Sequence, residues 1–173
     1  NDLDWLNERT IIIDTGTIGP FLGLDANSSR SNVAHAAACK SLTKEILKSS
    51  HDYSIGICAP YRAQIKLLQN LINDEKATKP IQIGTVHTYQ GDEKDILIFD
   101  SVESYGAATL PGLSLNQVDP ERSNMLTVAI SRARSALILV ANLQYLDSKL
   151  PAQSYFRKIL YQAQQHGRVI DVK

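Results

Sequence analysis

Four short apolar runs constrain the fold of this chain more than any other feature of its sequence. The runs are Ile11–Ile13, Ile55–Cys58, Ile96–Phe99 and Ala136–Val140. A strand with one face in water alternates apolar and polar residues, so unbroken apolar runs indicate strands that are buried on both faces. Amphipathic segments with helical spacing separate the runs. This alternation predicts an α/β domain in which helices cover both faces of a parallel sheet.

Helix and loop signals between the runs set the expected boundaries of the other elements. Ser29 or Ser31 can cap a helix that extends to about Lys48, because apolar residues recur there every four positions. A second amphipathic helix follows Pro60. The remaining expected elements are a loop at Ile18–Ser31, a strand at Ile81–Thr85, a surface excursion at Glu103–Pro120, a helix or turn at Asn124–Arg134, a last helix around Phe156–Ala163 and an edge strand at Arg168–Asp171.

Length and composition limit the kinds of protein that this chain can be. Its 173 residues are expected to form one domain. Lys plus Arg and Asp plus Glu balance at 18 each, so nucleic-acid binding would need a local basic surface. Cys39 and Cys58 lack metal-ligand spacing, and we expect them to be buried free thiols in a reducing compartment.

The sequence shows no targeting signal. No apolar run approaches the ~18 residues of a membrane span, and no signal peptide is present. We therefore expect a cytoplasmic protein without membrane contact, or a nuclear one in a eukaryote. The chain begins at Asn1 rather than at a methionine, and we expect it to be one piece of a longer protein.

The stretch Ile81–Asp100 concentrates polar chemistry between two strands. Its two expected strands, Ile81–Thr85 and Ile96–Phe99, flank the polar segment Val86–Asp95, which contains one glycine, Gly91, and several ionisable side chains. A polar connection between buried strands usually places functional side chains at the strand ends. On local grounds, the alternative is an ordinary solvated loop.

Two acidic positions resemble catalytic signatures that the rest of the sequence does not support. Asp14-Thr15-Gly16 looks like the turn of an aspartic protease, but that chemistry needs a second carboxylate and a mostly β scaffold. We expect a strand-ending turn with Gly16 available for positive φ, and a hydrolase that uses Asp14 is the alternative. Asp100 ends an apolar run as a magnesium-binding acid would. The sequence lacks the Gly-Lys pair of a phosphate-binding loop, so we expect a structural role for Asp100.

Three separated segments change this interpretation. Ala59–Gln64, Thr85–Asp95 and Val128–Arg134 approximately follow the patterns PYxxQ, TVxxxQGxExD and NVAxTRAR, in that order. They resemble motifs IV, V and VI of superfamily 1 helicases, in particular the branch of the RNA-surveillance and nuclease-associated helicases. Ser28–Asn32 resembles the serine–asparagine segment before the first helix of that branch. The resemblance covers Ile11–Asn142.

The resemblance implies a RecA-like domain, the second and C-terminal one of a two-domain ATP-dependent motor. ATP would lie in the cleft between the domains, and the upstream RecA-like domain would hold most of the Mg²⁺ and phosphate contacts. The implied partners are single-stranded DNA or RNA and that upstream domain. Helicase activity would belong to the full-length protein and not to this chain alone. A RecA-like nucleic-acid-binding or interaction module without enzymatic activity is the alternative.

The matching positions of motifs V and VI imply the contacts with ATP. Arg132 falls on the arginine finger, which places a cation against the charge that develops on the γ-phosphate. Glu93 falls on the acid that accepts hydrogen bonds from the ribose, and Gln90 and Gly91 lie beside it. If this part of motif VI is helical, Arg134 points away from Arg132.

Motif IV and the start of motif V imply the contacts with nucleic acid. Thr85 and His87 fall on positions that face the nucleic-acid backbone, where contacts carry no sequence information. Pro60, Tyr61 and Gln64 fall on the motif IV group on the same side. The ring of Tyr61 is suited both to stacking on a base and to core packing. One loop is thus expected to contact nucleic acid at one end and ATP at the other.

The sequence departs from the family pattern at three positions. Thr127 replaces an asparagine, which removes an amide from that position. Ser131 replaces a threonine but keeps the hydroxyl group. His35 stands where the branch often has glutamate.

Overall fold

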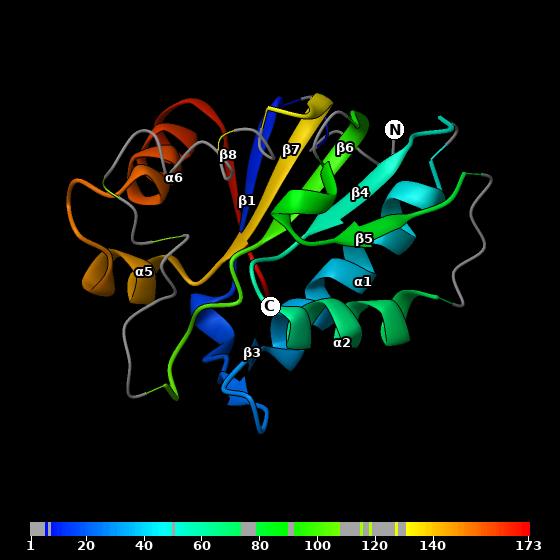
Figure 1. The fold of residues 1–173 in the computed structure, drawn as a ribbon. Helices are drawn as coiled ribbons and strands as arrows, with labels where there is room; N and C mark the ends of the chain where they lie inside the picture. The colour runs from blue at the N-terminus through cyan, green and yellow to red at the C-terminus, as the bar shows by residue number, and fades with distance from the viewer. Residues whose placement is uncertain are drawn as a thin grey trace.

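A single parallel sheet organises the molecule (Figure 1). The structure, a computed structural model, describes residues 6, 8–49, 51–73, 79–89, 92–107, 115, 118, 127 and 131–173. Within these residues, six parallel strands follow the order β5-β4-β6-β7-β1-β8. They are β1 (Thr10–Asp14), β4 (Ile55–Cys58), β5 (Gln82–Gly84), β6 (Lys94–Asp100), β7 (Ala133–Ala141) and β8 (Arg168–Asp171). The predicted α/β class with a parallel sheet is confirmed.

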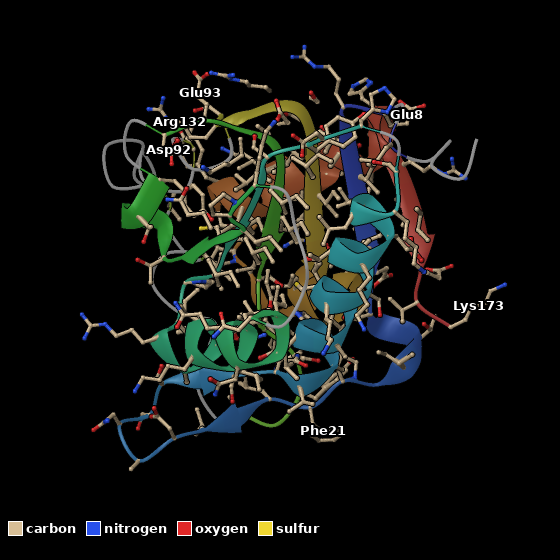
Figure 2. All side chains as sticks on the ribbon, turned by 90° about the vertical axis from the view of Figure 1, so that its right-hand side faces the viewer. Glu8, Phe21, Asp92, Glu93, Arg132 and Lys173 are labelled. Atoms are coloured by element: carbon tan, nitrogen blue, oxygen red, sulfur yellow. The ribbon has the colours of Figure 1, made fainter. Side chains whose placement is uncertain are left out.

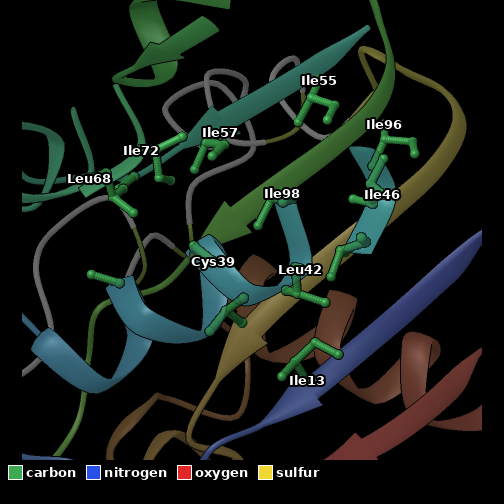
Figure 3. Packing of buried hydrophobic residues seen from close by; sticks show 14 of the residues in the cluster. Ile13, Cys39, Leu42, Ile46, Ile55, Ile57, Leu68, Ile72, Ile96 and Ile98 are labelled. Atoms are coloured by element: carbon green, nitrogen blue, oxygen red, sulfur yellow. The ribbon is translucent and has the colours of Figure 1, made fainter. Parts of the chain in front are cut away.

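Helices cover both faces of this sheet. One face packs against α1 (Val33–Leu47) and α2 (Arg62–Ile72), and the other against α5 (Leu143–Lys149) and α6 (Tyr155–His166). Alternate residues of β6 serve the two cores: Ile96 and Ile98 belong to the core under α1 and α2 (Figure 3), whereas Leu97 and Phe99 belong to the other. The strand is apolar throughout Ile96–Phe99 because both of its faces are buried there. The domain therefore has a RecA-like architecture.

The hydrogen bonds at the helix starts differ from those expected. α1 begins at Val33, and its N-cap is Asn32 rather than Ser29 or Ser31, because Asn32 Oδ1 accepts a hydrogen bond from the His35 amide at 3.1 Å. Ser29 caps a different helix: its Oγ accepts from the Ala63 amide in the first turn of α2 at 3.1 Å. The polar segment before α1 thus fixes the starts of two helices.

Two further expectations about local structure are wrong. Gly16 does not adopt positive φ; the left-handed residue of that turn is Gly19, at a φ of 55°. The expected loop Ile18–Ser31 contains a small antiparallel hairpin of β2 (Gly23–Leu24) and β3 (Arg30–Ser31).

The segments around the expected surface excursion also differ from the prediction. Glu103 and Ser104, its first two residues, are completely buried, and Ser104 donates a hydrogen bond to the Pro20 carbonyl at 2.6 Å. Most of the remaining residues of 103–120 lie outside the described part of the chain. Ala133 and Arg134 belong to β7 rather than to the expected helix or turn.

Both cysteines are free and buried, as predicted. Burial raises the pKa of Cys58 to about 12, and it also raises the pKa of Cys39. No helix in the described part of the chain is long and apolar enough to cross a membrane.

Candidate nucleotide and nucleic-acid sites

The amino ends of β6 and β7 bring the ends of motifs V and VI together. Lys94 pairs with Ala133 in the sheet register, and the Lys94 amide donates a hydrogen bond to the Arg132 carbonyl at 3.0 Å. Glu93 and Arg132 each precede one member of this pair, so they are neighbours at the same edge. Figure 2 shows both residues there, on the opposite side of the molecule from Phe21.

The side chain of Arg132 contains a buried hydrogen-bond donor. Its Nε is buried, and none of the described residues accepts a hydrogen bond from it. A buried donor without a partner is costly, and guanidinium groups bind phosphate oxygens well. Arg132 is therefore suited to an anionic ligand at this edge.

Glu93 is held by a second arginine. Arg134 Nε donates to Glu93 Oε2 at 2.7 Å, and this hydrogen bond raises the pKa of Arg134. Beside it, Lys94 Nζ lies 3.1 Å from a carboxylate oxygen of Asp92. Arg134 therefore does not point away from the site, as a helical motif VI would require. Gln90 and Gly91, the other predicted ATP contacts, lie outside the described residues.

The predicted nucleic-acid contacts lie at the opposite edge of the sheet, which is formed by the carboxyl ends of the strands. Pro60 and Tyr61 follow the carboxyl end of β4, and Thr85 follows the carboxyl end of β5. The Ala59 amide donates to the Gly84 carbonyl at 3.3 Å, which joins the two strand ends. Pro60, Tyr61 and Thr85 are half-buried, and the side chain of His87 lies outside what the structure describes.

Tyr61 takes part in a buried charged group. Its hydroxyl donates to Glu103, and Arg30 Nη1 lies 2.5 Å from the other carboxylate oxygen of Glu103. The Arg30 guanidinium also lies 5.7 Å from the centroid of the Tyr61 ring. The hydroxyl group of Tyr61 is thus used inside the domain, and only its ring is suited to a base.

Gln64 is completely buried. Its Nε2 donates to Asp100 Oδ2 at 2.6 Å and to the Asn32 carbonyl at 3.1 Å, and its Oε1 accepts from the Asn32 amide at 2.8 Å. Both ends of the amide are occupied, and the side chain has no exposed atom for a strand. We interpret Gln64 as a residue that positions motif IV against α1.

Asp100 has the structural role that the missing Gly-Lys pair indicated. Besides Gln64, the His35 ring and the Val102 amide each bond its carboxylate at 2.8 Å. The other His35 nitrogen lies 2.8 Å from Thr15 Oγ1. This order of groups resembles a hydrolytic triad, but Thr15, His35 and Asp100 are completely buried, so a substrate cannot reach them. Asp100 and His35 form a core network.

Asp14 also serves the fold. Its Oδ1 accepts hydrogen bonds from the Gly16 amide at 2.9 Å and the Leu143 amide at 3.1 Å. It therefore closes the turn after β1 and fixes the start of α5. This is the strand-ending turn that the sequence predicted.

Sequence reasoning missed two residues that hold motif V in place. The buried Tyr89 hydroxyl lies 3.0 Å from the Ile57 carbonyl and 2.5 Å from the Gln82 carbonyl. A Cβ at Gly56 would lie 2.8 Å from the Tyr89 ring, so a glycine is required there. The sequence does contain a signal for this contact: Tyr89 is an aromatic residue within a polar motif, and Gly56 is a glycine inside an apolar strand.

The second missed residue is Asp95. Its Oδ2 accepts hydrogen bonds from the Ser54 hydroxyl at 2.6 Å and the Ser54 amide at 2.7 Å. These bonds lower the pKa of Asp95. The end of motif V is thereby tied to the residue before β4.

The fold and the placement of the motifs define a class of protein. A parallel sheet with helices on both faces, and with the ends of motifs V and VI adjacent at its amino edge, is the arrangement of a RecA-like helicase domain.

Comparisons with known proteins identify the family. A family model described as an AAA domain matches residues 3–144. The chain is 37% identical over 94 residues to DNA polymerase alpha-associated DNA helicase A of Saccharomyces cerevisiae, which is 54% of this chain and 13% of that protein. It is 32% identical over 143 residues to the DNA replication ATP-dependent helicase/nuclease DNA2 of Bos taurus, which is 82% of this chain and 12% of that protein. The chain belongs to this AAA domain family and is a superfamily 1 helicase domain.

A third relative is named as an RNA helicase. The chain is 33% identical over 88 residues to the probable RNA helicase armi of Drosophila melanogaster, which is 51% of this chain and 7% of that protein. Across the three relatives, the chain spans between 7 and 13% of the protein it matches.

Proposed function

We propose that this chain is the second, C-terminal motor domain of an ATP-dependent superfamily 1 DNA or RNA helicase. One observation carries the proposal: Glu93 and Arg132 are neighbours at the amino edge of the sheet, and the buried Arg132 Nε has no acceptor among the described residues. An acid and a cation side by side suit the ribose and the phosphate of one nucleotide.

Arg132 would act on the γ-phosphate of ATP. Negative charge redistributes over the phosphate oxygens in the transition state, and a fixed guanidinium stabilises that charge. The backbone of Arg132 is bonded to β6 through Lys94, so the position of the cation follows the position of the whole sheet. Glu93 would accept hydrogen bonds from the ribose hydroxyls.

We expect an upstream RecA-like domain to hold Mg²⁺. Within the described residues, no group of three His, Cys, Asp or Glu side chains could hold a metal ion. The carboxylate of Asp100 is already bonded to His35 and Gln64. The metal ion and most of the phosphate contacts would therefore come from an upstream RecA-like domain.

Single-stranded nucleic acid would lie across the carboxyl ends of β4 and β5. Pro60, Tyr61, Thr85 and His87 would contact it, and Gln64 would act indirectly by holding α2 against α1. The relatives are named as DNA helicases and as an RNA helicase, so we propose a single strand of either kind.

Replacement of Arg132 tests this function. In the full-length protein, Arg132→Ala should lower kcat for ATP by roughly 10³-fold or more, and ATP affinity should fall much less. Arg132→Lys should rescue poorly, because an ammonium lacks the planar fork that binds two oxygens. kcat and ATP affinity are measured separately for each variant.

The matched control is Arg157→Ala. Arg157 lies on α6, outside both motifs, where it pairs with Asp147 at 2.6 Å and donates to the Leu150 carbonyl at 3.0 Å. The Arg157→Ala variant should turn over ATP like the unmodified protein. If the full-length protein hydrolyses no ATP but binds single strands, the module without enzymatic activity is the correct reading. Full turnover by Arg132→Ala would refute the proposed finger.

A further inference from the structure

The Glu93–Arg134 ion pair connects a loop residue to a rigid strand. Arg134 is the second residue of β7, a nine-residue strand that is bonded to β6 on one side and β1 on the other. Glu93 immediately precedes β6. The contact runs from Arg134 Nε to Glu93 Oε2 at 2.7 Å. The Glu93 carboxylate is therefore held by a side chain of a strand that is paired on both sides within the sheet.

This ion pair adds little to the stability of the fold. Its two side chains are 64% and 47% exposed, and exposed pairs are weakened by water and by salt. Its physical effect lies in the direction of the carboxylate. An unpaired glutamate samples several rotamers, whereas a charge-assisted hydrogen bond to one carboxylate oxygen favours those that keep the carboxylate in one place.

We propose that Arg134 is a positioning residue that orients the Glu93 carboxylate toward the ribose hydroxyls of ATP. Arg134 thereby sets how strongly this domain distinguishes a ribonucleotide from a deoxyribonucleotide. The inference rests on the proposed function, in which Glu93 binds the ribose. Arg132 and Arg134 then have different tasks: the first acts on the phosphate, and the second acts on the sugar through Glu93.

The test compares ATP with 2′-deoxy-ATP as substrates of the full-length protein. The measured quantity is kcat/KM for ATP divided by kcat/KM for 2′-deoxy-ATP. Both substrates carry the same phosphates, so effects on the phosphates cancel in this ratio. Glu93→Gln should lower the ratio by about tenfold, the size expected for one hydrogen bond to a charged group. Arg134→Ala should lower the ratio in the same direction by raising the KM for ATP, with kcat nearly unchanged.

Two further measurements separate positioning from a structural role. The double variant Glu93→Gln/Arg134→Ala should be no worse than Glu93→Gln alone, because both changes remove the same interaction. The ratio of the unmodified protein should fall as ionic strength rises, whereas that of Arg134→Ala should stay constant. Arg157→Ala is again the control for loss of a surface ion pair. Arg134→Gln, which keeps the length of the side chain, repeats the test if Arg134→Ala folds poorly.

The outcomes distinguish a failure of the positioning role of Arg134 from a failure of the proposed motor function. If Glu93→Gln lowers the ratio and neither Arg134 variant changes it, the positioning role is refuted and the motor function stands. The positioning role is also refuted if Arg134→Ala lowers kcat for both nucleotides equally. If Glu93→Gln itself leaves the ratio unchanged, the proposed ribose contact of Glu93 fails, whatever the Arg134 variants do.

Discussion

The Lys94 amide donates a hydrogen bond to the Arg132 carbonyl at 3.0 Å, and this bond fixes the end of motif V against the end of motif VI. The other end of motif V, at Thr85, lies at the opposite edge of the sheet. β6 has seven residues, which places the two edges roughly 20 Å apart. A nucleotide and a single strand bound at these edges would not touch, so motif V itself must connect them.

We predict no ATP turnover by this chain alone. It supplies Glu93 and Arg132, but it lacks a phosphate-binding loop, so most of the ground-state contacts with ATP are missing. A steady-state ATPase assay with single-stranded nucleic acid present should give only background. Turnover at the ~1–100 s⁻¹ of phosphoryl-transfer enzymes would contradict the prediction.

At the carboxyl edge, Thr85→Ala and His87→Ala should weaken single-strand binding by the full-length protein. The loss should be similar for several base sequences, because backbone contacts carry no sequence information. Fluorescence anisotropy with a set of oligonucleotides measures it. His166→Ala, at the end of α6, changes an exposed histidine outside motifs IV, V and VI and should bind normally. A loss that appears with only one sequence would mean that these residues read bases.

Tyr89→Phe should destabilise this domain by about 1–3 kcal/mol, because removal of the hydroxyl leaves the buried Ile57 carbonyl and the half-buried Gln82 carbonyl with one partner fewer. Urea unfolding of the isolated chain measures the change. Tyr161→Phe is the matched control, since Tyr161 is 65% exposed on α6 and should unfold at the same urea concentration as the unmodified chain. Equal stability of the two variants would show that the Tyr89 hydroxyl does not hold motif V to the sheet.

The Ser54–Asp95 contact predicts a stability difference that depends on pH. The Ser54 hydrogen bonds lower the pKa of Asp95 in the folded state, so their stabilisation is present above the ordinary aspartate pKa of about 3.9 and is lost as pH falls through the lowered value. Ser54→Ala should therefore cost about 1 kcal/mol at pH 7 and less in strong acid. Urea unfolding at several pH values checks this. Ser148→Ala removes a bond to the neutral Tyr145 carbonyl, and its effect should not change with pH.

The sequence by itself determined the class of fold and the family. Unbroken apolar runs such as Ile96–Phe99 require burial on both faces, and this requirement is local enough to be read residue by residue. The ordered motifs IV, V and VI identified a helicase domain for the same reason: each motif is continuous in sequence. The edge strand at Arg168–Asp171 and the last helix followed from local patterns too.

Only the tertiary structure decided which polar side chains meet. The partners of Gln64 are Asn32 and Asp100, each more than thirty positions away, and no local pattern shows that the amide is buried. A helical motif VI would turn Arg134 away from the site, whereas pairing with β6 makes its segment a strand and brings it to Glu93. Strand pairing is a contact between distant segments. The register that places Glu93 beside Arg132, and the edge that separates both from Thr85, therefore exist only once the sheet has formed.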